Sequence, residues 1–148
     1  DRVEFLFSAN PGEPLHPLQK IASGGELSRF MLAAKSALRE VDPVPIMVFD
    51  EIDQGIGGET GFVLGEKLRQ LGKERQVIVV THLPQIACFA DHHFLVRKIE
   101  SDYHTEVLIE KLDREGRVEE LTRMLGGSES ASTAYRHAQE LLERYSGV

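Results

Sequence analysis

Two pairs of polar residues stand where they could do phosphate chemistry. Asp50-Glu51 and Thr81-His82 each directly follow four apolar residues. A continuous apolar run of that length is typical of a strand buried on both faces. In an open parallel sheet, ligands bind in the crevice outside the carboxyl ends of the strands. We therefore expect both pairs to face one crevice from neighbouring strands.

The residue types in these pairs suit ATP hydrolysis. The carboxylate of Asp50 can hold Mg²⁺, usually through a water molecule, because this hard cation prefers oxygen ligands and keeps part of its hydration shell. Glu51 can orient and polarise the water that attacks a γ-phosphate. His82 can hydrogen-bond the same phosphate and sense its presence. Acids at strand ends can also merely begin turns or cap helices, and the pair alone does not decide between these readings.

A second group, Ser23-Gly24-Gly25-Glu26, precedes a segment with helical periodicity. Glycines let a backbone approach phosphate closely, and a helix N-terminus presents free N–H groups with a partial positive charge. The hydroxyl of Ser23 adds a donor. The same residues fit an ordinary capping box between Ser23 and Glu26. Capping and phosphate contact do not exclude each other.

Four other residues invite simpler interpretations. Arg29 lies on the predicted helix, and we expect it to face solvent, although it could help to position a nucleotide. Cys88 lies beside a short apolar helix and is expected in the core, since no positioned base would activate its thiol. Gly61 and Gly65 stand four residues apart and predict a close approach of their helix to the sheet.

The elements that position these residues follow an α/β order. Alternating or continuous apolar runs predict strands at Val3–Ser8, Ile46–Phe49 and 77–80, and a hairpin of Phe94–Ile99 with Tyr103–Leu112. Helical spacing predicts helices from Glu26 to before Pro43, Glu59–Leu71, Gln85–Phe89, Val118–Leu125 ended by Gly126-Gly127, and Ala131–Tyr145.

Composition sets outer limits on function. The 148 residues, 41% of them hydrophobic, can form one ordinary domain with a sizeable core. The sequence holds no apolar stretch long enough to span a membrane and no signal-peptide pattern. Its single cysteine fits a reducing compartment, and a cytoplasmic, nucleoid-associated location is expected. The net charge of −7 would repel nucleic acid, so DNA contact needs a local patch or another part of a longer protein.

Together these segments resemble the SMC-type ABC ATPases. Residues 21–29 resemble the ABC signature, 46–51 resemble Walker B with the catalytic glutamate, 53–58 fall in the D-loop region, and 80–82 resemble the H-loop. Their order matches that of ABC ATPases. The residues around the motifs are similar to those of one bacterial DNA-repair branch of this family. The similarity extends over nearly all of residues 1–148.

The resemblance implies a fold and a partner set. The expected fold is the C-terminal lobe of an ABC/SMC-type P-loop NTPase head, α/β, with a largely parallel sheet, flanking helices and a terminal antiparallel hairpin. In that family an N-terminal lobe supplies the P-loop, a coiled coil separates the lobes, and two heads sandwich two ATP molecules. DNA is contacted through the full-length protein, and the implied process is repair of double-strand breaks by recombination.

The resemblance also implies roles for individual residues. Asp50, Glu51 and His82 would act beside the nucleotide of their own head, with Asp50 on Mg²⁺. The signature residues would meet, in trans, the γ-phosphate held by the other head: Ser23, Gly24, Gly25 and Glu26.

Two departures from the family pattern limit these expectations. No GxxxxGK[ST] sequence occurs, so the P-loop lobe and the coiled coil lie outside this chain, which alone is expected to bind ATP poorly. The position six residues after Glu51, an aspartate in many ABC proteins, is Gly57. Contacts between heads would then fall to Asp53, Gly57 or the loop backbone.

Two other functions compete with the ATPase interpretation. The same fold could be a non-catalytic lobe that docks a partner protein or a coiled coil. Asp50, Glu51 and His82 could also form a metal-dependent hydrolase for another phosphate ester, although this leaves the signature-like loop unexplained.

Overall fold

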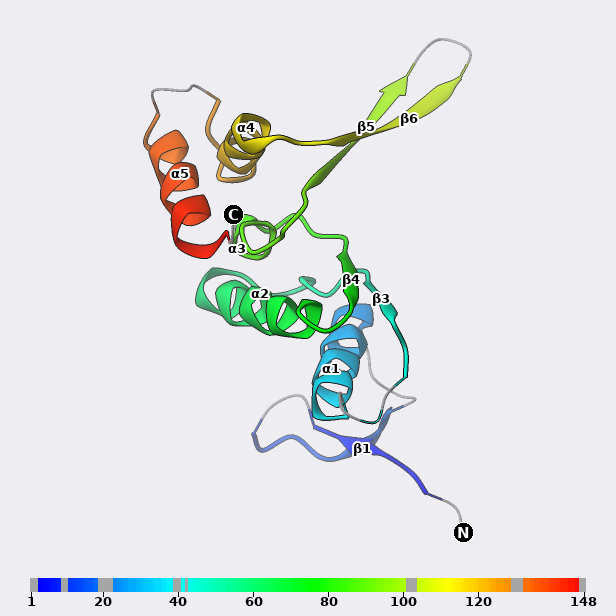
Figure 1. The fold of residues 1–148 in the computed structure, drawn as a ribbon. Helices are drawn as coiled ribbons and strands as arrows, with labels where there is room; N and C mark the ends of the chain where they lie inside the picture. The colour runs from blue at the N-terminus through cyan, green and yellow to red at the C-terminus, as the bar shows by residue number, and fades with distance from the viewer. Residues whose placement is uncertain are drawn as a thin grey trace. The chain divides into compact units, whose positions relative to one another are not determined.

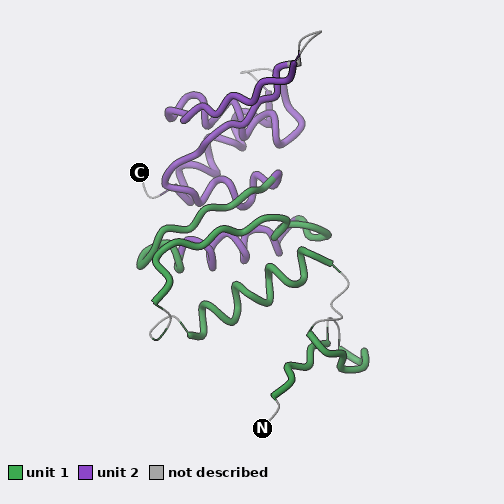
Figure 2. Tube along the Cα trace, turned by 90° about the vertical axis from the view of Figure 1, so that its right-hand side faces the viewer, with its two compact units in different colours: residues 1–57, 70–81 green, residues 58–69, 82–148 purple. Residues whose placement is uncertain are grey.

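The computed structural model describes residues 3–8, 11–18, 23–38, 41, 43–100, 104–128 and 132–146. The chain forms two compact units, residues 1–57 with 70–81 and residues 58–69 with 82–148 (Figure 2). Each unit is therefore built from segments that are separated in sequence. None of the helices in the described ranges is long and apolar enough to cross a membrane.

The first unit contains one long helix and two short pairs of strands (Figure 1). Strands β1 (Leu6–Phe7) and β2 (His16–Pro17) pair antiparallel, and helix α1 spans Gly24–Ala37. The ring of Phe7 meets Phe30 of α1 edge-on at a centroid distance of 6.1 Å, which ties this ribbon to the helix.

The central strands β3 (Ile46–Phe49) and β4 (Gln76–Val79) pair in parallel, from Ile46↔Gln76 to Phe49↔Val79. One further bond, from the Val80 N–H to the Phe49 carbonyl at 2.9 Å, continues the pairing. The predicted neighbouring strands are confirmed, and their carboxyl ends lie at the same edge.

The prediction that these strands are buried on both faces is wrong for this chain. Met47 and Phe49 are buried, but Ile46 and Val48 are 51% and 65% exposed. Side chains alternate across a strand, so one complete face of the pair is open. Ile78 and Val80 continue that face on the neighbouring strand, and both are exposed. No described element covers these side chains.

The second unit contains helices and the predicted hairpin. Helix α2 spans Gly58–Gly72 and lies mainly in this unit, followed by α3 (Pro84–Ala87). Strands β5 (Phe94–Glu100) and β6 (Thr105–Lys111) pair antiparallel and confirm the hairpin. Helices α4 (Arg114–Met124) and α5 (Thr133–Tyr145) complete the unit.

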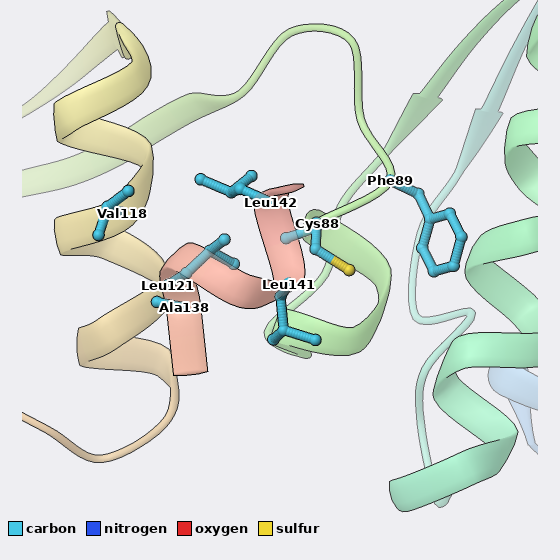
Figure 3. Close-up of a cluster of buried hydrophobic side chains, with 8 residues drawn as sticks. Cys88, Phe89, Val118, Leu121, Ala138, Leu141 and Leu142 are labelled. Carbon is cyan, nitrogen blue, oxygen red and sulfur yellow. The ribbon is translucent and has the colours of Figure 1, made fainter. Parts of the chain in front are cut away.

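The core of this unit joins α3, α4 and α5 (Figure 3). Cys88 and Leu121 are fully buried there, as is Ala138 on the clearest amphipathic helix. Burial raises the pKa of the Cys88 thiol to about 12, so it stays protonated at neutral pH. The expectation that Cys88 is a core residue is confirmed. Buried neighbours complete the cluster: Ala87, Phe89, Val118, Leu141 and Leu142.

Side-chain caps set the start of the last two helices. The Asp113 carboxylate accepts a hydrogen bond from the Gly116 N–H at 2.8 Å, and α4 begins earlier than the predicted Val118. The helix ends at Met124, one residue before the predicted Leu125, and Gly126 follows with a φ of 81°, which favours glycine. The Ser132 hydroxyl caps α5 through the Tyr135 N–H at 3.1 Å. The predicted start of this helix, Ala131, lies outside the described residues.

The glycines of α2 permit a close approach to α3, not to the sheet as predicted. A Cβ at Gly65 would lie 2.5 Å from the ring of Phe89 and 2.9 Å from the Gln85 carbonyl. A Cβ at Gly61 would lie 3.0 Å from the Cβ of Gln85. Two helices therefore touch here over glycine backbone, and Phe89 points toward α2 (Figure 3).

Candidate functional site

The N-terminus of α1 is built from Ser23 and two glycines. The Ser23 hydroxyl accepts a hydrogen bond from the Glu26 N–H at 3.2 Å, which confirms the expected cap. Gly25 is buried, and a Cβ there would lie 2.8 Å from the Cβ of Gln54. A side chain at this position would push the neighbouring loop away. Ile21 and Ala22, the first residues of the signature-like segment, lie outside the described residues.

The two candidate catalytic carboxylates follow β3. Asp50 and Glu51 are both exposed, and the Glu51 N–H donates to the Asp50 carboxylate at 2.8 Å. Glu51 has a φ of 56°, in the left-handed region that few non-glycine residues adopt. Its carboxylate lies against the backbone of Gly24. The strand end, the glutamate and the start of α1 thus form one local cluster in the first unit.

The loop after β3 is fastened to α1 by side chains of the helix. The Ser28 hydroxyl donates to the Asp50 carbonyl at 2.9 Å. One nitrogen of Arg29, Nη1, donates to the carbonyls of Ile52 at 3.1 Å and Gln54 at 2.8 Å. The prediction that Arg29 faces solvent is therefore wrong, because its guanidinium is used to bind the loop backbone.

Gln54 completes this attachment from the loop side. Its side-chain carbonyl Oε1 accepts a hydrogen bond from the Gly25 N–H at 3.2 Å. No sequence pattern pointed to Gln54, since a loop residue has no periodicity. A signal for Arg29 did exist: it stands four residues after Gly25, and residues i and i+4 share one face of a helix.

Asp53 links the same loop to the neighbouring strand. It is only 4% exposed, and the Thr81 hydroxyl donates to its carboxylate at 2.6 Å. The ends of β3 and β4 are therefore connected, as expected for two polar pairs at one sheet edge. His82 follows Thr81, is exposed, and begins the second unit.

The glycines after Gln54 shape the approach to α2. Gly55 and Gly58 have φ values of 75° and 55°, which favour glycine. Gly57 is extended, with a φ of −170°, and precedes α2 without a side-chain cap. The residue that stands where many ABC proteins have an aspartate thus offers backbone groups only.

A magnesium ion at Asp50 would have to complete its ligands with groups from outside the described residues. Among the described residues, no group of three or more His, Cys, Asp or Glu side chains could hold a metal ion alone. Mg²⁺ at phosphate-transfer sites uses one or two carboxylates and completes its shell with water and phosphate oxygens. The exposed carboxylate of Asp50 suits that mode.

Solved SMC head domains share this fold. An SMC head domain with a coiled coil from Pyrococcus yayanosii matches with a TM-score of 0.55 and 21% identity, over 82% of this chain and 25% of that one. An SMC ATPase studied for ATP-driven dimerization and DNA-stimulated activation matches with a TM-score of 0.50 and 23% identity, over 81% and 79%. No protein-family model matches the chain. The chain has the α/β fold of an SMC-type head lobe.

Sequence comparison narrows the class to one DNA-repair family. DNA repair protein RecN of Treponema pallidum is 53% identical over 96% of this chain, and RecN of Streptomyces coelicolor is 49% identical over 97%. RecN of Bacillus subtilis is 42% identical over 97%. The chain spans about a quarter of the length of these curated relatives. The resemblance to a bacterial repair branch of the SMC-like ATPases is confirmed, and that branch is RecN.

Proposed function

We propose that this chain supplies the signature, Walker B and H-loop elements of a RecN-type ATPase head that acts in DNA double-strand break repair. One observation carries the proposal. The loop that bears Glu51 is fastened on one side to the signature-like helix, through Ser28 and Arg29, and on the other to the end of β4, through Asp53 and Thr81. The segments proposed as ATPase motifs are thus linked to one another by their own side chains.

Each residue has a task in the proposed reaction. Glu51 holds the attacking water in line with the γ-phosphate and accepts a proton from that water. Asp50 would hold a Mg²⁺ ion, which would neutralise charge on the phosphates. His82 hydrogen-bonds the γ-phosphate of the same nucleotide.

The start of α1 would serve the nucleotide of a second head. Ser23, Gly24 and Gly25 would face its γ-phosphate with a hydroxyl and the positive end of the helix, and Glu26 keeps the cap in place. Because Asp53 is engaged with Thr81, contact between heads in this loop would rest on the backbone around Gly57 more than on that carboxylate.

The remaining partners follow from what this chain lacks. Its sequence has no P-loop, so a further lobe of the polypeptide would supply one, together with a coiled coil. The open apolar face of β3 and β4 would receive that lobe, since parallel sheets are normally covered on both faces. With a net charge of −7, the chain would leave DNA contact to other parts of the protein. A role in DNA repair like that of its relatives would place it in the cytoplasm.

The decisive test is ATP turnover by this chain together with its P-loop lobe. We expect Glu51→Gln to lower turnover at least about 100-fold, because the amide cannot accept the proton of the attacking water. ATP-dependent pairing of heads should persist, since glutamine has nearly the same shape. Steady-state phosphate release and analytical ultracentrifugation with ATP measure the two quantities.

Glu143→Gln is the matched control, since Glu143 is exposed on α5 and belongs to none of the three motifs. It should leave both quantities unchanged. Normal turnover in Glu51→Gln would refute the role of Glu51. A well-folded, nucleotide-bound wild-type assembly without turnover would favour a lobe that only docks a partner. Nuclease activity of the chain, lost in Asp50→Ala, would instead favour a hydrolase of another phosphate ester.

A further inference from the structure

The strongest unexplained feature is the pair of side chains that joins α1 to the Glu51 loop. Arg29 and Gln54 belong to neither the catalytic pair nor the glycine motif, yet they make three of the hydrogen bonds between helix and loop. They act in opposite directions: Arg29 reaches from the helix to loop carbonyls, and Gln54 reaches from the loop to a helix N–H.

The Arg29 contacts fix the shape of the loop. The two carbonyls that it binds lie on either side of Asp53, whose carboxylate is held by Thr81. A left-handed backbone at a non-glycine residue such as Glu51 persists only where the surroundings impose it. With Ser28 on the carbonyl of Asp50, these contacts bracket Glu51 and account for its conformation.

The Gln54 contact occupies a group that the proposed reaction needs. The N–H of Gly25 is one of the first-turn amides that would face the γ-phosphate of a second head. In this structure it donates to Gln54 Oε1. A phosphate oxygen that accepts a hydrogen bond from this N–H must therefore replace Gln54 Oε1 as the acceptor. Gln54 lies three residues from Glu51 in the same loop.

We propose that Arg29 and Gln54 are positioning residues that couple the phosphate-facing start of α1 to the catalytic carboxylate of Glu51. Arg29 holds the loop so that Glu51 keeps its backbone conformation. Gln54 holds the Gly25 N–H until the γ-phosphate of the second head displaces it, and that displacement changes the restraint on the Glu51 loop. This inference rests on the proposed function, and it adds two residues with separable effects.

The test uses the complete polypeptide that carries this chain. We expect Arg29→Ala to lower kcat about tenfold or more, because small displacements of a catalytic group are costly, with KM for ATP unchanged within about twofold. Arg29→Lys should restore part of the loss, since its ammonium can donate to the same carbonyls. Arg97→Ala is the control, since Arg97 is exposed on the hairpin in a long ion pair of 3.8 Å, and it should have no effect.

A second measurement separates positioning from a general loss of structure. In the Glu51→Gln background, Arg29→Ala should leave ATP-dependent pairing of heads intact. In the same background, Gln54→Ala should lower the ATP concentration for half-maximal pairing by about threefold to tenfold, because the phosphate no longer competes with one hydrogen bond.

The outcomes are distinguishable. Wild-type kcat in Arg29→Ala, while Glu51→Gln remains inactive, overturns the inference and leaves the proposed function standing. Loss of pairing in Arg29→Ala, with no rescue by Arg29→Lys, assigns Arg29 a structural role only. Unchanged or weaker pairing in Gln54→Ala removes the competition step. Absence of wild-type turnover overturns the proposed function, and the inference with it.

Discussion

Glu51 combines an exposed carboxylate with a backbone conformation that costs on the order of 1–3 kcal/mol for a non-glycine residue. Strain of this kind persists at functional positions because neighbouring contacts impose it. Here the contacts are the Ser28 hydroxyl and the Arg29 guanidinium, both bound to backbone carbonyls around Glu51. The backbone conformation of Glu51, and with it the direction of its side chain, is therefore set by neighbouring contacts and not by the intrinsic preference of glutamate.

His93 in the second unit is a partly buried histidine whose protonation depends on folding. Burial, followed by the charge of Arg117, lowers the pKa of His93 below its usual range, and Glu120 opposes them. Its Nδ1 is buried without a hydrogen-bond partner in the described part of the chain. The folded state therefore favours neutral His93. The unfolded state binds more protons once the pH falls below about 6.5.

We expect the melting temperature to fall as the pH is lowered from 7.5 to 5.5, and the fall to be smaller in His93→Gln. Stability from this group is complete above the unfolded pKa and is lost as the pH falls from there toward the folded pKa. Thermal melts followed by circular dichroism measure both slopes. His92→Gln replaces an exposed neighbour and should keep the wild-type slope. Equal slopes in wild type and His93→Gln would contradict the assignment.

At the scale of elements, contact between α2 and α3 depends on glycine. Gly65 faces the ring of Phe89, which also stacks on Tyr145 at a centroid distance of 4.7 Å. The Arg69 guanidinium donates to the Tyr145 carbonyl, so α2 holds the end of α5 as well. A change at Gly65 would therefore reach two elements of this unit.

We expect Gly65→Ala to lower the free energy of unfolding by about 1–3 kcal/mol, because the added methyl meets the Gln85 backbone as well as the Phe89 ring. Gly72→Ala, in the same helix with nothing within 4 Å of the new methyl, should be neutral or stabilising by up to about 1 kcal/mol. Urea unfolding curves give both values. Equal urea midpoints for Gly65→Ala and Gly72→Ala would show that α2 and α3 can move apart at little cost, and would contradict the prediction.

The sequence predicted the helices and strands better than it predicted their burial and their packing partners. The hairpin, the parallel pair and the five helices all occur near their predicted residues, because apolar periodicity and caps act locally. Burial was predicted less well. The apolar runs of β3 and β4 are typical of a sheet that is covered on both faces, but the described residues of this chain cover only one face. The prediction that the glycines of α2 face the sheet was wrong, because glycine spacing indicates a close approach but does not identify the element that approaches.

The candidate site shows the same limit. Ser23, Asp50 and Glu51 stand in recognisable motifs, whereas the hydrogen bonds of Arg29 and Gln54 join residues 23 and more positions apart. Only the folded chain brings those groups together. Local patterns therefore locate candidate chemistry, and tertiary structure reveals what holds it in place.

At the scale of the molecule, the open face of β3 and β4 matters most. Ile46, Val48, Ile78 and Val80 are all at least 46% exposed, and they lie on one side of the parallel pair. Contiguous apolar surface of this kind marks a site of association. The chain by itself should pair or aggregate through it.

We expect the double variant Val48→Thr and Val80→Thr to weaken self-association of the chain by roughly an order of magnitude, since each substitution replaces a methyl that association would bury. Sedimentation velocity over a concentration series measures it. Val63→Thr, at an exposed position of α2, is the matched control and should leave association unchanged. An unaltered association constant in the double variant would place the contact elsewhere.

The interleaving of the two units bears on synthesis at the ribosome. Residues 1–57 emerge before the rest of this chain, but their unit also needs residues 70–81, which supply β4. Between these events the nascent chain must make most of α2, which belongs mainly to the other unit. The Glu51 loop can therefore meet Thr81 only late, and a translational pause before residue 76 would leave β3 unpaired along an edge that other chains could join.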